Sequence, residues 1–246
     1  MKQIIEIDGL ALAAYEEMGD GPVLVCVPGG PGYGGEQLGS LGGLDATRRL
    51  VLCDLRGAGA SDLPRTRSWA IADYAHDLDA IRDALGLERV AVMGHAHGAL
   101  VATRYALDNP DRVSALVLDA VPVRRIEDVD AESDQQIGGY FAKYDDTAKR
   151  YVTEHMGSMV EQALAWFWDN EVSDDLAAPL LDLKTPTLLI DGSKDPLGGE
   201  TPTRELAKKM HDCKFTVIEG ASHFPWVDQP RVYAEVVEAF LASMTP

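Results

Sequence analysis

Residues 92–100 read VMGHAHGAL, and this stretch decides how the rest of the chain is interpreted. The short run 89–93 predicts a strand, and apolar residues at helical spacing follow the stretch. We therefore predict a tight strand-to-helix turn. Gly94 and Gly98 have no side chains, so they permit a cramped turn that lifts the central residue above the sheet. That central residue is Ala96, whose methyl group cannot attack a carbonyl.

Length and charge restrict the classes of function. The chain has 246 residues, with 40 acidic against 22 basic residues and a net charge of −18. This length allows one large α/β domain together with an inserted segment. The acidic balance argues against nucleic acid and anionic membranes, because both are bound by clustered Lys and Arg. We expect a small-molecule substrate and leave a homodimer open.

The chain start and the cysteines carry no targeting or metal signal. Glu6 and Asp8 interrupt the first apolar residues, unlike a signal peptide, and no stretch approaches the roughly 18 apolar residues of a membrane span. Cys26, Cys53 and Cys213 form neither a disulfide framework nor a metal-ligand spacing. We therefore expect a soluble cytoplasmic protein with no metal and no cofactor.

Apolar runs alternate with helical patterns along most of the chain. This order predicts an α/β fold with a mostly parallel, eight-stranded sheet flanked by helices, in which ligands bind beyond the carboxyl ends of the strands. A last helix is expected to begin near Asp228 as its N-cap. The predicted strands are 2–8 and 10–17 as a hairpin, then 22–27, 49–53, 89–93, 113–118, 186–190 and 214–218; helices are predicted over 70–85, 99–109 and 201–211.

Residues 122–179 differ from the rest because they show helical composition and many aromatic residues, but no strand pattern. We predict that they form a small helical cap over a core domain made of residues 1–121 and 180–246. Trp166 and Phe167 are expected to line the site beneath it.

Two loops follow predicted strands and contain several glycines. The loop 28–35 has two prolines and no lysine, so a backbone donor for an oxyanion is favoured over a phosphate cradle, with Gly30 as the donor. In the loop 54–61 we expect Arg56 to pair with Asp54 or Asp62 and to carry no chemistry.

Two residues at the predicted sheet edge can complete a catalytic triad with position 96. Asp195 follows a late strand and His223 follows the last one, which gives the chain order nucleophile position, acid, histidine. His223 would act as the base, and Asp195 would fix its tautomer.

Four motifs in this order resemble the α/β-hydrolase superfamily, and most of all its proline iminopeptidase-like branch. They are PGGPG at 28–32, DLRGAGAS at 54–61, DGSKD at 191–195 and SHFP at 222–225, and the resemblance covers about residues 20–120 and 184–243. The chain departs from the family pattern at Pro28, where the family has histidine, and at Ala96, where the nucleophilic serine is expected.

The resemblance implies roles for individual residues. Gly30 and His97 would donate backbone N–H groups to the oxyanion, and Asp195 would be the acid, with Asp119 as the alternative acid. Asp191 is expected to stabilise its loop. The remaining residues expected around the substrate are Gly29, Tyr33, His95 and Phe224, in addition to Trp166 and Phe167.

The sequence thus predicts a serine hydrolase that cleaves a compact, largely apolar ester or lactone through an acyl-enzyme. Because Ala96 occupies the nucleophile position, we expect the chain to be inactive as written, and we favour an introduced replacement of serine. Three alternatives stay open: an aminopeptidase of proline iminopeptidase type, a non-hydrolytic binding protein, and a cofactor-free lyase or oxygenase. An aminopeptidase would need a carboxylate from the cap, such as that of Glu154, Glu161 or Glu171.

Overall fold

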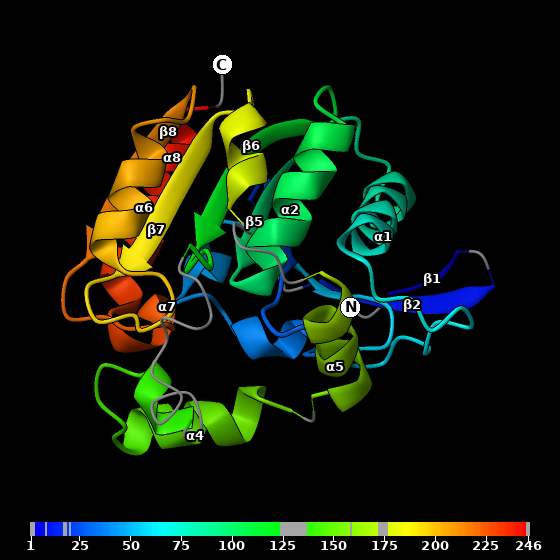
Figure 1. The fold of residues 1–246 in the computed structure, drawn as a ribbon, viewed down its shortest axis with the longest axis horizontal. Helices are drawn as coiled ribbons and strands as arrows, with labels where there is room; N and C mark the ends of the chain where they lie inside the picture. Colours follow the sequence, from blue (N-terminus) through cyan, green and yellow to red (C-terminus); the bar gives the residue numbers. More distant parts are fainter. Residues whose placement is uncertain are drawn as a thin grey trace.

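An eight-stranded sheet forms the centre of the molecule, with its strands in the order β1-β2-β4-β3-β5-β6-β7-β8 (Figure 1). β1 pairs antiparallel with β2, and β2 with β4, whereas all other neighbours are parallel. The predicted mostly parallel sheet of eight strands is confirmed. The strands are β1 Gln3–Ile7, β2 Leu10–Glu16, β3 Val23–Val27, β4 Arg49–Asp54, β5 Val90–His95, β6 Val113–Asp119, β7 Thr187–Gly192 and β8 Cys213–Ile218. This computed structural model describes residues 3–7, 9–16, 19, 21–123, 137–157, 159–171 and 177–244.

Helices cover both faces of the sheet. The cluster that contains α1, α2 and α6 packs on one face, and α8 packs on the other. The predicted helices are present, although the one predicted over 201–211 ends earlier, at Ala207. The helices are η1 Gly35–Leu38, η2 Leu44–Ala46, α1 Ile71–Ala84, α2 His97–Asp108, η4 Ile137–Tyr140, α4 Asp146–His155, α5 Glu161–Asn170, η5 Ala178–Asp182, α6 Glu200–Ala207, α7 Pro225–Asp228 and α8 Pro230–Ala242. Among the residues described, no helix is long and apolar enough to cross a membrane.

β3 shows why the central strands are continuous apolar runs. Val25 and Val27 belong to the hydrophobic cluster on the α1 and α2 face, whereas Leu24 and Cys26 belong to the cluster on the α8 face. Successive side chains of a strand point to opposite faces, so a strand covered on both faces needs apolar residues throughout. The sheet is thereby fixed between two hydrophobic cores.

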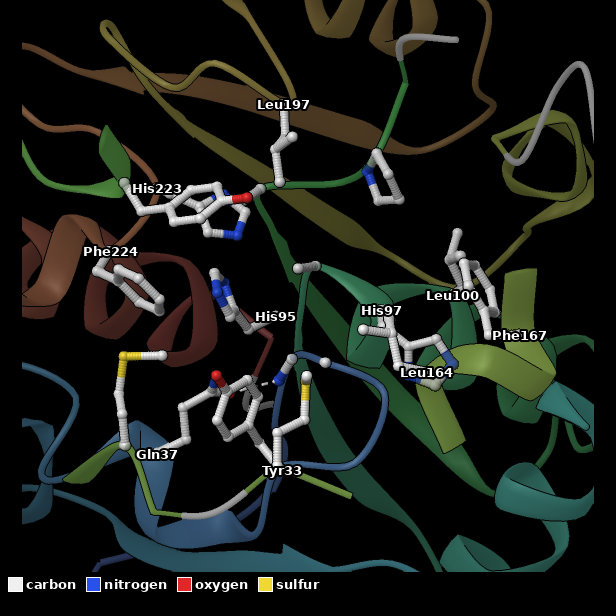
Figure 2. Close-up of a pocket in the computed structure, with 18 of the residues that line it drawn as sticks. Tyr33, Gln37, His95, His97, Leu100, Leu164, Phe167, Leu197, His223 and Phe224 are labelled. Carbon is white, nitrogen blue, oxygen red and sulfur yellow. Dashed lines mark hydrogen bonds between the residues drawn. The ribbon is translucent and has the colours of Figure 1, made fainter. Parts of the chain in front are cut away.

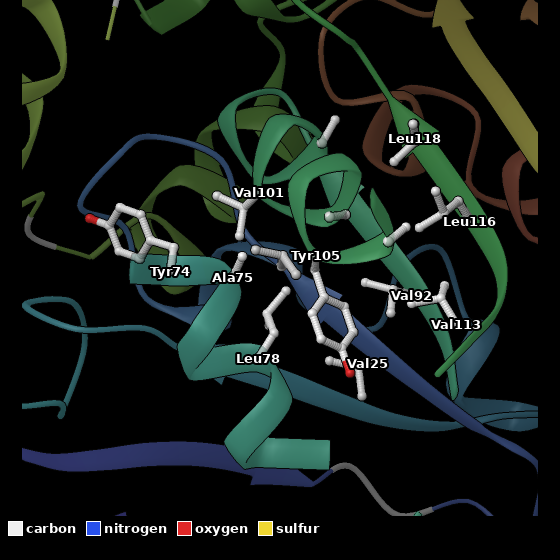
Figure 3. Packing of buried hydrophobic residues seen from close by; sticks show 14 of the residues in the cluster. Val25, Tyr74, Ala75, Leu78, Val92, Val101, Tyr105, Val113, Leu116 and Leu118 are labelled. Carbon is white, nitrogen blue, oxygen red and sulfur yellow. The ribbon is translucent and has the colours of Figure 1, made fainter. Parts of the chain in front are cut away.

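The contact between α1, α2 and the sheet holds the turn that precedes α2. Leu78 of α1 lies beside Tyr105 of α2, and these residues form one hydrophobic cluster with Tyr74, Val25 and Val92 (Figure 3). All five residues are at most 2% exposed. Because α2 is packed along its length, its N-terminus is held at the carboxyl end of β5.

The segment 137–171, described except for residue 158, contains η4, α4 and α5. Figure 1 shows α4 and α5 beyond the end of the sheet toward which the arrowheads of β6 and β7 point. Two backbone hydrogen bonds tie this segment to loops at that edge: Val160 N–H donates to the Gly32 carbonyl at 3.0 Å, and His223 N–H donates to the Tyr140 carbonyl at 3.1 Å. The segment therefore lies at the sheet edge where ligands of open α/β folds bind.

The prediction that Asp228 caps the last helix is wrong. α8 begins at Pro230 with Gln229 as its N-cap, and Asp228 ends the preceding short helix α7. The Asp228 carboxylate instead accepts the N–H groups of Ser222 at 2.8 Å and Ala142 at 3.0 Å. It joins the loop after β8 to the segment 137–171.

The predicted partner of Arg56 is also wrong. Its guanidinium donates two hydrogen bonds to Asp77 on α1, at 2.7 and 2.8 Å. Asp54 accepts the N–H of Gly35, and Asp62 accepts a backbone N–H from β2. Local turn chemistry could not identify Asp77, because this ion pair joins a loop to a helix 21 residues away.

Candidate active site

The turn between β5 and α2 is centred on Ala96, which has φ 48° and ψ −114°. A residue other than glycine with positive φ costs about 1–3 kcal/mol, so the surrounding structure must hold it. A Cβ on Gly94 would lie 2.3 Å from the carbonyl oxygen of Gly98, and one on Gly98 would lie 2.4 Å from that of Val27. Both glycines are therefore required for the turn.

Gly30 and His97, the two residues predicted to donate backbone N–H groups, line the same cavity as Ala96. His97 is the first residue of α2, so its N–H has no acceptor within the helix and lies at the positive end of the helix dipole. Gly30 has φ 125°, a conformation that L side chains rarely adopt. The loop is fixed by a 2.7 Å hydrogen bond from Gly29 N–H to Gln37 Oε1. This pair can stabilise negative charge on a carbonyl oxygen.

His223 and Asp195 form a buried pair. Nδ1 of His223 lies 3.0 Å from Oδ2 and 3.2 Å from Oδ1 of Asp195, and the two side chains are 7% and 0% exposed. Burial alone would raise the pKa of Asp195, but the charge and hydrogen bond of His223 and the N–H groups of Leu197 and Gly198 lower it. An ionised Asp195 accepts a hydrogen bond from Nδ1–H of His223, which leaves Nε2 of His223 as the basic nitrogen.

His95 and Asp119 form a second buried pair. Nδ1 of His95 lies 3.2 Å from Oδ2 of Asp119, and the side chains are 1% and 0% exposed. Burial and the charges of Asp195 and Asp191 raise the pKa of Asp119, whereas burial and the nearby His223 lower the pKa of His95. Asp119, the alternative acid, is thus placed against His95, and both groups favour their neutral forms.

The two histidine rings lie side by side. Figure 2 shows His95 next to His223, with Phe224 beside them. The ring centroids of His95 and His223 are 4.7 Å apart. Trp226 approaches His95 edge-on, with ring centroids 4.8 Å apart. This close aromatic packing restricts the orientation of both imidazoles.

Asp191 is a third carboxylate near this edge. Burial and the neighbouring Asp195 raise its pKa to about 7. The hydroxyl of Thr203 donates to its Oδ2 at 2.9 Å, which connects the end of β7 with α6. This contact agrees with the loop-stabilising role expected for Asp191.

A cavity of about 500 Å³ opens onto Ala96, a volume in the range of small-ligand sites. Among the described residues, its lining contains no Asp, Glu, Lys or Arg, and most of the lining is apolar. The lining residues are Gly29, Gly30, Tyr33, Gln37, His95, Ala96, His97, Leu100, Ala120, Pro122, Ile137, Tyr140, Met156, Met159, Leu164, Phe167, Trp168, Leu197, His223 and Phe224. The cavity can therefore take a compact, uncharged and largely apolar molecule.

Comparison with known proteins identifies the family. A family model described as the alpha/beta hydrolase fold matches residues 22–169. The chain belongs to the α/β-hydrolase family. This hydrolase is 24% identical to a proline iminopeptidase of Heyndrickxia coagulans, over 98% of both chains. It is 40% identical to a putative carbamate hydrolase, RutD, of Klebsiella pneumoniae, over 39% of this chain and 36% of that one. The structure of a thermophilic esterase from Thermogutta terrifontis superimposes with a TM-score of 0.81 at 21% identity, covering all of both chains.

In this α/β hydrolase most residues predicted to surround the substrate do line the cavity, but Trp166 does not. Trp166 packs against the hydrophobic cluster of the core, and Trp168, which was not predicted, lines the cavity instead. Leu164, Phe167 and Trp168 have the spacing i, i+3, i+4, so they share one face of α5. That spacing was visible in the sequence and distinguishes these residues from Trp166.

The side chain of His97 packs against two aromatic rings and also lines the cavity. Its ring makes edge contacts with Tyr74 and Phe167, at centroid distances of 5.4 and 5.2 Å. Nε2 is buried and has no hydrogen-bond partner among the residues described. Burial lowers the pKa of His97 to about 3, so the ring is neutral at ordinary pH.

Proposed function

We propose that the cavity at Ala96 is a hydrolase active site that binds a compact, largely apolar ester or lactone. Cleavage through an acyl-enzyme requires a serine at position 96, and the methyl group of Ala96 cannot form the acyl-enzyme. In the chain as it stands, the cavity holds the substrate with its carbonyl oxygen near the N–H groups of Gly30 and His97. Residues 137–171 act as a cap over the bound molecule.

The described residues that line the cavity include no Asp, Glu, Lys or Arg, and this observation carries the proposal. An aminopeptidase must bind the α-ammonium group of its substrate, and a carboxylate inside the site would be needed for that. Glu154 and Glu161 are exposed, and Glu171 accepts the N–H of Ile71 at the start of α1. None of these three lines the cavity. Among the described residues, the lining thus favours an uncharged substrate.

The similar proteins act on related bonds. By name they include a peptidase, a putative carbamate hydrolase and an esterase, so attack on a carbonyl carbon is the shared chemistry. The likeness to the iminopeptidase keeps cleavage of an amide as the alternative. The uncharged cavity is the reason for preferring an ester or a lactone.

With a serine introduced at position 96, each group has one task. Nε2 of His223 takes the hydroxyl proton while the serine oxygen bonds to the carbonyl carbon, and Gly30 and His97 donate to the oxyanion. The carbon–oxygen bond to the leaving group then breaks, and the leaving group takes the proton from His223. Asp195 stabilises the imidazolium in between. Water, activated in the same way, releases the acid and restores the serine.

The substitution Ala96→Ser tests the proposal in a paired assay. We expect it to hydrolyse a hydrophobic p-nitrophenyl ester and an apolar lactone with higher kcat/KM than a prolyl arylamide. The double variant Ala96→Ser/His223→Ala should lose this activity, whereas Ala96→Ser/His211→Ala should keep it, because His211 is exposed and outside the cavity. A preference for the arylamide would favour the aminopeptidase. Tight binding of an apolar ester without any turnover would favour a binding protein.

A further inference from the structure

The chain with Ala96 retains every group of the proposed mechanism except the nucleophile. His223 and Asp195 are paired within 3.2 Å, and the turn between β5 and α2 has the positive φ of 48° at position 96. Gly30, Ala96, His97 and His223 all line the same cavity. A carbonyl bound to the two N–H groups would therefore lie over a methyl group, with a histidine base beside it.

We propose that the chain with Ala96 hydrolyses activated carbonyl compounds by direct attack of water, with His223 as general base and without an acyl-enzyme. This inference rests on the proposed function, because it uses the same cavity and the same N–H groups. It replaces the expected inactivity with slow turnover that does not depend on a nucleophilic side chain.

The reaction balances without any further reactant. His223 Nε2 takes one proton from water as the water oxygen bonds to the carbonyl carbon, and the π electrons of the carbonyl move to its oxygen. The carbon–oxygen bond to the leaving group then breaks as the carbonyl re-forms. The leaving alkoxide takes the proton from His223, so the products are a carboxylic acid and an alcohol.

The tautomer of His223 suits this role. Its Nδ1 faces the Asp195 carboxylate, so the lone pair on Nε2 is free to accept a proton from water. His95 is less suited, because its Nδ1 lies 3.2 Å from Asp119, a carboxyl group with one buried oxygen that has no hydrogen-bond partner among the described residues and with a pKa raised by burial. The base is therefore assigned to His223 and not to its neighbour.

Magnitudes indicate the class of substrate. A positioned general base contributes about 10²–10⁴ in rate, and an oxyanion donor contributes about 10²–10³. These factors suffice when the carbonyl is already reactive, as in an aryl ester or a strained lactone. They do not suffice for an unactivated amide, whose spontaneous hydrolysis is far slower than that of esters. The Ala96 site is thus restricted to activated esters and lactones.

The experiment compares the unaltered chain with four variants, including Ala96→Ser as the control that has a nucleophile, and uses p-nitrophenyl butyrate as the substrate. We expect saturable turnover with no burst and no acylated protein by intact mass. His223→Ala should reduce the rate by about 10² or more, and Asp195→Asn, which preserves the shape of the side chain, should also reduce it clearly. His211→Ala is the matched control on an exposed histidine, and its rate should be unchanged. Thermal melting of each variant establishes that it is folded.

Three results would overturn the inference. A rate of the unaltered chain equal to that of folded His223→Ala and Asp195→Asn would remove His223 as the base. An acyl adduct on His223 or another side chain would show covalent catalysis instead. If Ala96→Ser gives a burst and turnover while the unaltered chain gives none, this inference fails and the proposed function stands. If neither protein binds or hydrolyses the ester, the proposed function itself fails.

Discussion

Two histidine–aspartate pairs lie at the same edge of the sheet, and the pKa values of their carboxyl groups are shifted in opposite directions. Asp195 with His223 and Asp119 with His95 have similar closest Nδ1-to-oxygen distances, 3.0 and 3.2 Å, and all four side chains are at most 7% exposed. Asp195 receives a hydrogen bond from Leu197 N–H, and its pKa is lowered. Asp119 has one oxygen that is buried and without a partner among the residues described, and its pKa is raised.

The difference teaches that the residue types do not define the chemistry. A buried carboxylate stays ionised where backbone N–H groups and a cation stabilise it, and it takes up a proton where burial and neighbouring carboxylates dominate. The pair of Asp195 is therefore better suited to stabilise an imidazolium than the pair of Asp119, whose carboxyl pKa is shifted in the opposite direction.

The largest expected effect is on turnover. In the Ala96→Ser background, Asp195→Asn should lower kcat by about 10²–10⁴, because an amide cannot hold the required tautomer or stabilise the imidazolium. Asp119→Asn replaces a carboxyl group that already favours its neutral form, and it should lower kcat less than tenfold. Steady-state kinetics on one hydrophobic ester measures both. Equal losses in the two variants would remove the distinction between the pairs.

The second expected effect is on stability, where changing the Asp119 pair should cost more than changing the Asp195 pair. His95→Ala leaves Asp119 without its partner in a dry site, which should cost about 1–3 kcal/mol of unfolding free energy. His223→Ala should cost less, because Asp195 keeps its backbone N–H donors. Urea unfolding at neutral pH gives both values. A larger loss for His223→Ala would mean that the Asp195 pair is the structural one.

The third expected effect is on the pH dependence of stability, with a slope of at most about 1.4 kcal/mol per pH unit for each group. Asp119 has a raised pKa, so the folded state binds its proton more tightly, and its contribution falls as pH rises above the ordinary value of 3.8. Asp195 has a lowered pKa, so its contribution is lost as pH falls below 3.8.

Melting curves across this pH range measure the third effect. Asp119→Asn should gain in Tm relative to the unaltered chain as pH rises from 4 to 8, by about 2–4 °C for each kcal/mol. Asp195→Asn should have a lower Tm than the unaltered chain near neutral pH, and this difference in Tm should shrink as pH falls below 3.8. Parallel pH profiles for the two variants would contradict the assigned charges.

The smallest expected effect concerns His97, a buried histidine without a carboxylate partner. Its pKa is lowered to about 3 by burial, so its ring signals should not titrate between pH 8 and 4.5. Two-dimensional NMR of the histidine rings, with assignment from His97→Asn, measures this. A titration of His97 in that interval would show that the pocket admits more water than its packing implies.

The sequence predicted the features that depend on periodicity and chain order. Continuous apolar runs predicted the parallel strands, since strands covered on both faces must be apolar throughout. The order of position 96, Asp195 and His223 predicted which residues meet, because the carboxyl ends of parallel strands lie at one edge.

The features that depend on three-dimensional contacts were not predictable. Asp119 ends β6, Asp191 lies near the end of β7 and Asp195 follows β7, so all three lie at the same edge, and the chain order alone does not state that Asp119 faces His95. The same holds for Asp228, whose partner Ala142 is 86 residues away. Trp168 could have been found from its helical spacing with Leu164.

Covalent trapping shows directly whether position 96 lies between a working base and two oxyanion donors. A fluorophosphonate incubated with the Ala96→Ser variant should add one adduct per chain, located at position 96 by peptide mass spectrometry. Formation of the adduct should be much slower in Ala96→Ser/His223→Ala. Absence of labelling in the folded single variant, or labelling elsewhere in the chain, would contradict the account.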